Sequence, residues 1–95
     1  MIDLAQIKQK IQQTFSPLFL EIDDESQAHA GHSGAVIGEI THLRITICSE
    51  YFNELSKIKQ HRSINECLKD ELNSGLHALA LKTYNTQQWE KVNHG

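Results

Sequence analysis

The sequence predicts a single α+β domain in which helices and three strands follow the order α-β-β-α-α-β-α. Apolar residues recur at helical spacing between residues 3 and 15, and apolar and polar residues alternate strictly over 41–48. A third stretch, 76–83, is rich enough in leucine and alanine for a largely buried strand. Because 95 residues have room for one hydrophobic core, we expect one domain over residues 1–95.

The first half of the chain contains a helix, a short strand and a long loop. The helix is predicted over residues 3–15, where the apolar side chains share one face and Asp3 can cap the first turn. Pro17 ends this helix, because proline disfavours helical geometry in the residue before it. A short strand follows at 18–22, and the glycine-containing segment 26–38 is typical of a long, mobile hairpin loop.

The second half begins with the alternating strand, which is predicted to be antiparallel and half-exposed, with a helix over its apolar face. After a short apolar turn, Ser56 can cap the main helix, and Gly75 can end it with a left-handed cap. The strand at 76–83 comes next, Thr86 is predicted to cap a final helical turn that returns Trp89 to the body, and 91–95 is predicted to fray. The expected inner positions of the main helix are Ile58, Ile64, Cys67, Leu68 and Leu72.

Composition limits the function. Nine Lys and Arg against twelve Asp and Glu give a net charge of −3, so no global positive field attracts nucleic acid or an anionic membrane. Two cysteines, which we expect to be structural, are too few for a disulfide framework or a four-thiolate metal site and fit a reduced cytoplasmic compartment. We expect neither a signal peptide nor a membrane anchor, and the absence of common catalytic motifs predicts that the chain is not an enzyme.

The histidines are the unusual feature, since six occur in 95 residues. His29, His32 and His42 lie within fourteen positions, and the first two belong to the predicted loop. Neutral imidazole is a good ligand for zinc, iron and copper. For a lone loop histidine, however, a solvated surface side chain is the commoner explanation.

His77 differs from these three because it shares strand parity with Leu79 and Leu81. Its ring is therefore expected beside an apolar face, where a titratable group needs a partner or a use. Two interpretations remain open: a metal ligand, or a histidine at the edge of the core that is hydrogen-bonded to backbone.

A single local basic cluster occurs in the predicted main helix, and positions 57, 61 and 62 can share one face of that helix. Such a face could make a few phosphate contacts, although a solvated helix face is the commoner explanation. The cluster consists of Lys57, Lys59, His61 and Arg62.

Several short motifs, spread from Leu4 to Trp89, together resemble the BolA family. They are Leu20-Glu21-Ile22, Asp24-Glu25-Ser26, Thr41-His42-Leu43, Ser49-Glu50-Tyr51-Phe52, His61-Arg62 with Leu68, Glu71 and Leu72, and above all Leu76-His77-Ala78-Leu79-Ala80-Leu81-Lys82-Thr83. The resemblance implies a three-stranded mixed sheet packed against helices, similar to the class II KH domain. His42 and His61 belong to the family pattern with structural or surface roles, and His94 belongs to the tail.

The first role that the resemblance implies is partnership with a monothiol glutaredoxin in iron-sulfur trafficking or iron regulation. The two proteins would share a 2Fe-2S cluster, to which this chain contributes His77 and the loop residue His29, with His32 as the alternate. Because this chain lacks suitable thiolates, a glutaredoxin cysteine and bound glutathione would supply the sulfur ligands. No cofactor is expected in the isolated chain.

The second implied role is transcriptional regulation by binding duplex DNA, through the basic cluster. Here Asn53-Glu54-Leu55-Ser56 stands in place of the G-x-x-G loop with which KH domains clamp phosphates. Glu54 replaces a glycine common in the family, and Gln60 replaces an arginine, so we rank DNA binding second. A third possibility is a small protein-interaction module with incidental histidines, and self-association as a weak homodimer stays open.

Overall fold

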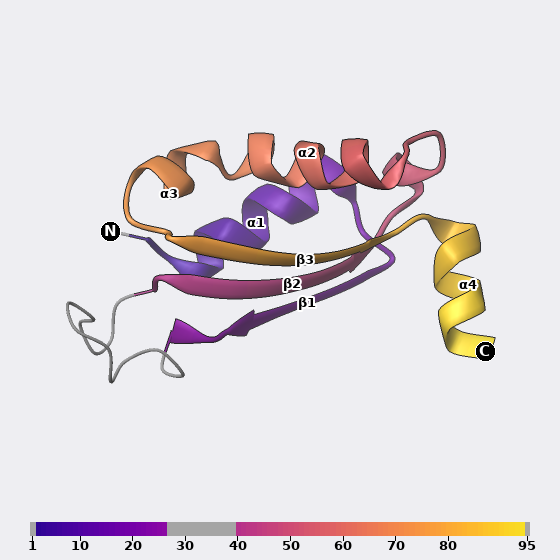
Figure 1. The fold of residues 1–95 in the computed structure, drawn as a ribbon, viewed down its shortest axis with the longest axis horizontal. Coiled ribbons are helices and arrows are strands. Elements are labelled where there is room, and N and C mark those ends of the chain that lie inside the picture. The colour runs from indigo at the N-terminus through magenta and orange to yellow at the C-terminus, as the bar shows by residue number, and fades with distance from the viewer. Residues whose placement is uncertain (1, 27–39, 95) are drawn as a thin grey trace.

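The computed structural model describes residues 2–26 and 40–94. The elements are α1 (Leu4–Phe15), β1 (Phe19–Asp24), β2 (His42–Cys48), the 3-10 helix η2 (Glu50–Phe52), α2 (Lys57–Cys67), α3 (Lys69–Asn73), β3 (Ala78–Tyr84) and α4 (Thr86–His94). Figure 1 shows α1, α2 and α3 against the sheet and α4 at the far end of β3. The α+β fold class and the element order are confirmed, with η2 as the short turn before α2 and the main helix divided between α2 and α3.

The sheet is mixed, as the family resemblance implies. β2 lies in the centre, antiparallel to β1 and parallel to β3, in the order β1-β2-β3. The parallel pair requires a crossover connection, which η2, α2 and α3 provide. Paired residues share a face, so the Ile22–Ile45–Leu81 row points toward the helices.

The hydrophobic core lies between this face of the sheet and the helices. The alternating residues of β2 are fully buried, and they meet the apolar stripe of α1 and the inner positions of α2. The central core residues are Ile7, Ile11, Phe15, Leu43, Ile45, Ile47, Phe52, Ile64 and Leu68.

Short-range signals set the ends of α1 and β1. Asp3 caps α1 by accepting a hydrogen bond from the backbone N–H of Ala5 at 2.8 Å. Ser16 ends the helix with a left-handed φ of 44°, just before Pro17. β1 runs two residues beyond the predicted strand, because its aspartates continue the pairing with β2 as far as Leu43.

Two expectations about the main helix are wrong. Ile58, predicted to face the core, is 71% exposed, and Gln60, a polar residue, is fully buried in its place. The inner stripe therefore runs through Gln60, Ile64 and Leu68, which are four residues apart. The helix also breaks at Leu68, where φ is −105° and ψ is 19°, and this break separates α2 from α3.

Gln60 is buried because its amide connects four segments of the fold. The amide nitrogen donates to the carbonyl oxygens of Leu55 at 3.0 Å and Phe52 at 3.4 Å. It also lies 3.3 Å from the side-chain oxygen of Gln88, on α4. The amide oxygen accepts from the Thr83 hydroxyl of β3 at 2.9 Å, so the buried polar group is satisfied on both sides.

The last helix starts differently from the prediction. Asn85, rather than Thr86, caps α4: its side-chain oxygen accepts from the Gln88 N–H, and the Gln88 side chain accepts from the Asn85 N–H, both at 2.8 Å. Trp89 returns to the body as predicted and stacks on Phe19 with ring centroids 4.7 Å apart. The helix continues to His94 and so takes in most of the segment expected to fray.

β3 is also less buried than expected. It begins at Ala78 rather than Leu76 and ends at Tyr84, with exposed and half-buried residues alternating along most of it. None of the helices in the described ranges has the length and apolar character needed to cross a lipid bilayer.

The hydrogen bonds of the Gln60 side chain lead to a prediction about stability. Gln60→Leu should lower the free energy of unfolding by about 1–3 kcal/mol, because the Thr83 hydroxyl and the Leu55 carbonyl lose a partner inside the protein. Urea denaturation followed by circular dichroism measures this loss. Gln13→Leu, on the exposed side of α1, is the matched control, and its free energy of unfolding should stay within about 0.5 kcal/mol of the parent's. Equal effects of the two substitutions would contradict the stabilising role of the Gln60 hydrogen bonds.

Candidate functional site

The strongest candidate site lies where β1 ends, β2 begins and the chain approaches β3. Ser26 and Thr41 lie on either side of the predicted loop. They are joined because the Ser26 hydroxyl accepts from the Thr41 N–H at 2.8 Å. The same hydroxyl accepts a hydrogen bond from the backbone N–H of His42 at 3.1 Å. We call this set of hydrogen bonds the Ser26–Thr41 clasp.

The clasp also fixes the segment that leads into β3. The Thr41 carbonyl accepts from the N–H of His77 at 2.8 Å and from that of Ala78 at 3.1 Å. A few hydrogen bonds thus hold together Ser26, Thr41 and the backbone of His77. Figure 1 shows the same end of the sheet, where β2 and β3 begin side by side.

Two imidazole rings meet at this end. The rings of His42 and His77 have centroids 6.4 Å apart and are inclined by 38°. The Nδ1 of His42 lies 2.9 Å from the Thr41 hydroxyl, a contact that orients the His42 ring. The His77 side chain is exposed, so its ring is accessible to a ligand or a partner.

The position of His77 differs from the expectation based on strand parity. It precedes β3 instead of lying inside it, and it is exposed, whereas Leu79 and Leu81 are half-buried toward the helices. The sequence did not indicate His42 as its neighbour, because that pairing depends on the parallel register of β2 with β3. His29 and His32 lie outside the described residues. Within the described ranges, no group of three or more His, Cys, Asp and Glu side chains is arranged to hold a metal ion.

The basic cluster is divided between two sides of α2. The ammonium of Lys57 donates to the Thr83 carbonyl and lies 4.5 Å from the Tyr84 ring centroid, and burial lowers the pKa of this lysine. Lys59 and Arg62 line a groove between α1 and α2 instead. Residues two apart on a helix point in nearly opposite directions, which explains the separation of Lys57 from Lys59.

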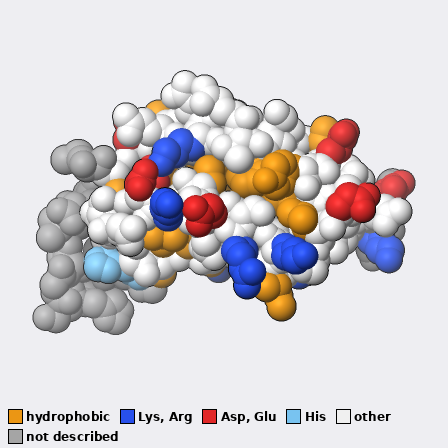
Figure 2. All heavy atoms as spheres, turned by 90° about the horizontal axis from the view of Figure 1, so that it is seen from above, with side chains coloured by type: hydrophobic (Ala, Val, Ile, Leu, Met, Phe, Trp, Pro, Cys, Tyr) orange, Lys and Arg blue, Asp and Glu red, His pale blue; other side chains and the backbone are white. Residues whose placement is uncertain are grey.

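Taken as a whole, the helical face carries charges of both signs (Figure 2). His61 is half-buried on α2. Figure 2 shows Lys and Arg side chains interspersed with Asp and Glu across the helical face, with hydrophobic side chains between them. The segment that replaces a phosphate-clamping loop is engaged as well, because the side-chain oxygen of Asn53 accepts from the N–H of Thr86 at 3.0 Å and from its hydroxyl at 3.1 Å.

The Ser26–Thr41 clasp leads to a prediction about amide exchange at Thr41 and His42. Ser26→Ala should speed hydrogen exchange at the Thr41 and His42 amides, because both lose their acceptor, and should lower stability by about 1–3 kcal/mol. Amide exchange followed by NMR measures the local effect. Ser74→Ala, at an exposed position after α3, is the control and should leave these amides unchanged; unchanged exchange in Ser26→Ala would refute the clasp.

Comparison with known proteins gives a consistent result. Residues 11–88 match the family model described as BolA-like protein. The chain is 38% identical to the DNA-binding transcriptional regulator BolA of Vibrio cholerae, over 92% of this chain and 78% of that protein. It is 36% identical to BolA-like protein 1 of Mus musculus, over 92% of this chain and 61% of that protein. The structure of BolA1 from Arabidopsis thaliana superposes with a TM-score of 0.80 at 31% identity, covering 92% and 95% of the two chains. The chain therefore belongs to the BolA-like protein family.

Proposed function

We propose that this chain is a cytoplasmic adaptor that binds a monothiol glutaredoxin and co-ligates a shared 2Fe-2S cluster with it. In this proposal His77 and His29 are the ligands from this chain, and His32 is the alternate to His29. The observation that carries the proposal is the exposed ring of His77 at the base of the segment that contains both other histidines.

The covalent reach of the chain supports this set of residues. His29 follows Ser26 by three residues, which span at most about 10 Å, and His32 follows it by six, which span at most about 20 Å. Ser26 is bonded to Thr41, and Thr41 is bonded to His77. A loop histidine and His77 can therefore meet without any change in the described part of the fold.

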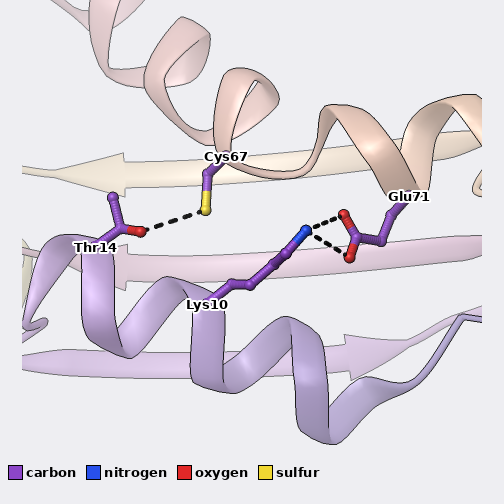
Figure 3. A network of polar contacts seen from close by, with 4 residues as sticks. All are labelled: Lys10, Thr14, Cys67 and Glu71. Atoms are coloured by element: carbon purple, nitrogen blue, oxygen red, sulfur yellow. Dashed lines mark hydrogen bonds and ion pairs between the residues drawn. The ribbon is translucent and has the colours of Figure 1, made fainter.

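The donor set of this chain also fits a cluster whose thiolates come from a partner. Cys48 is fully buried at the opposite end of β2 from His42, and burial raises the pKa of its thiol. The sulfur of Cys67 faces Thr14 of α1, 3.8 Å from its hydroxyl (Figure 3). Neither thiol lies beside the paired rings of His42 and His77, so imidazoles are the iron ligands that this site offers.

The chemistry of such a site follows from its ligands. A 2Fe-2S cluster held partly by imidazole has a higher reduction potential than one held only by thiolates. Imidazole binds iron in its neutral form, so protons compete for this ligand and acid weakens ligation. On this proposal the higher potential and the acid sensitivity suit cluster transfer or sensing better than storage. The clasp keeps the His77 backbone in place while the partner approaches.

Mixing the chain with a cluster-loaded monothiol glutaredoxin tests the proposal. We expect visible absorption and circular dichroism to change on mixing, and His77→Ala to remove most of that change, because the cluster loses an imidazole. His94→Ala is the control. An unaltered spectrum and an unaltered complex with His77→Ala would overturn the ligand assignment.

The same measurement separates the two loop histidines. If His29 is the ligand, His29→Ala alters the spectrum and His32→Ala leaves it unchanged; the reverse result would transfer the role to His32.

Duplex DNA binding is the second candidate function, favoured by the name of the Vibrio cholerae relative, a DNA-binding transcriptional regulator. Lys59 and Arg62 are exposed and available for phosphate contacts. Against this role stand the engagement of Lys57 with β3, the mixed charge of the helical face and the contact of Asn53 with α4. Any binding should then depend on a few cations.

This candidate predicts weak binding with a shallow salt dependence. Electrophoretic mobility shift should detect the complex at low salt, and the slope of log K against log salt should be about −2, or about −0.9 for each phosphate contacted. Lys59→Ala and Arg62→Ala should each weaken binding, whereas Lys57→Ala should change it little. Absence of a shift at low salt would exclude this function.

A further inference from the structure

A groove of about 640 Å³ lies between α1 and α2, and neither the cluster proposal nor the clasp uses it. We call it the α1–α2 groove. Its walls come from the last turns of α1, from the residues around η2 and from one side of α2. Its volume is within the range of pockets that hold small organic ligands.

Polar contacts between the helices hold one end of the groove at a fixed width. Lys10 on α1 makes an ion pair with Glu71 on α3, with 2.9 Å from the ammonium to each carboxylate oxygen. One turn along α1, Thr14 faces Cys67 (Figure 3). The hydrogen bond to Glu71 raises the pKa of Lys10, so this lysine stays charged and paired.

The groove carries cations that are not compensated inside the protein. Three of its lining residues, Lys10, Lys59 and Arg62, are cationic, and one, Glu66, is acidic. Glu66 lies 3.4 Å from Lys69, and Lys10 pairs with Glu71. Within the described part of the chain, Lys59 and Arg62 form no ion pair, so the groove is locally positive although the whole chain carries −3.

Aromatic and apolar residues line the same groove. Phe15 is buried at the base of the groove and holds the Tyr51 ring in an edge-to-face contact, with centroids 4.9 Å apart and planes at 88°. Tyr51 remains 53% exposed, and Leu55 lies half-buried in the same wall. A positioned, exposed aromatic ring is a stacking surface for a flat aromatic group.

From this combination we propose that the α1–α2 groove binds a phosphate monoester that carries a flat aromatic ring, about the size of a mononucleotide. The ring packs on Tyr51 and Leu55, and the phosphate meets Arg62 and Lys59. Arginine binds phosphate with two parallel hydrogen bonds, and a second cation favours a dianion over a singly charged carboxylate. The groove contains neither of the paired histidines, His42 and His77, nor any residue of the Ser26–Thr41 clasp.

Adenosine 5′-monophosphate is a suitable probe, measured by NMR titration of the intact chain. We expect saturable shifts on α1 and α2, with adenosine and inorganic phosphate each binding about tenfold more weakly or worse, because each makes only half of the contacts. Arg62→Gln should weaken binding at least about tenfold and reduce its salt dependence. Lys82→Gln, at an exposed position on the opposite face of the sheet, is the matched control and should bind as the parent does.

Cys67 provides an independent readout because this residue lines the groove and the other cysteine, Cys48, is fully buried. Adenosine monophosphate should slow alkylation of Cys67 by iodoacetamide in the folded chain, and adenosine alone should not. The proposal is overturned if saturating probe neither shifts the groove nor protects Cys67, or if Arg62→Gln binds like the parent. It is also overturned if duplex DNA protects Cys67 while the mononucleotide does not.

Discussion

The hydrogen bonds of Ser26 and Thr41 fix how the three strands come together at one end of the sheet. One hydroxyl, one carbonyl and the amides that they bind hold together the end of β1, the start of β2 and the approach to β3. Ser26 is 6% exposed, so water competes poorly for these bonds. Ser26 and Thr41 are therefore fixed beside the exposed side chain of His77.

The two ends of the sheet differ in how far other elements cover them. The outer face is polar along most of its length, with rows such as Glu21–Thr46–Lys82, and no helix is needed to cover it. Only at the α4 end does this face carry aromatic residues, Phe19 and Tyr84, and there Trp89 covers them. Because α4 is tied to the core through Gln60 and Gln88, it covers one end of the sheet, and at the other end the described residues leave His77 exposed.

The sequence was most informative where a property depends on near neighbours. Strict alternation identified the buried residues of β2, and Asp3 was recognisable as a cap because its acceptor oxygen serves an amide two residues away. It failed where distant segments decide. The outward turn of Ile58 and the burial of Gln60 follow from the partners that Thr83 and Gln88 offer, and the pairing of His42 with His77 follows from strand register. Its strand parity and its place in the 76–83 motif brought His77 into the candidate site, but its exposure and its neighbours required the tertiary structure.

The Lys57 contact has a consequence for how the sheet meets other chains. β3 is an edge strand, and its backbone alternates between groups that bond β2 and groups that point away from the sheet. The Thr83 carbonyl is one of the outward groups, and the Lys57 ammonium occupies it while lying over Tyr84. A foreign strand that aligned along this edge would have to displace a positive charge and its aromatic contact. Among the described residues no strand pairs with the outer edge of β3, and a lysine on such an edge disfavours pairing with a foreign strand.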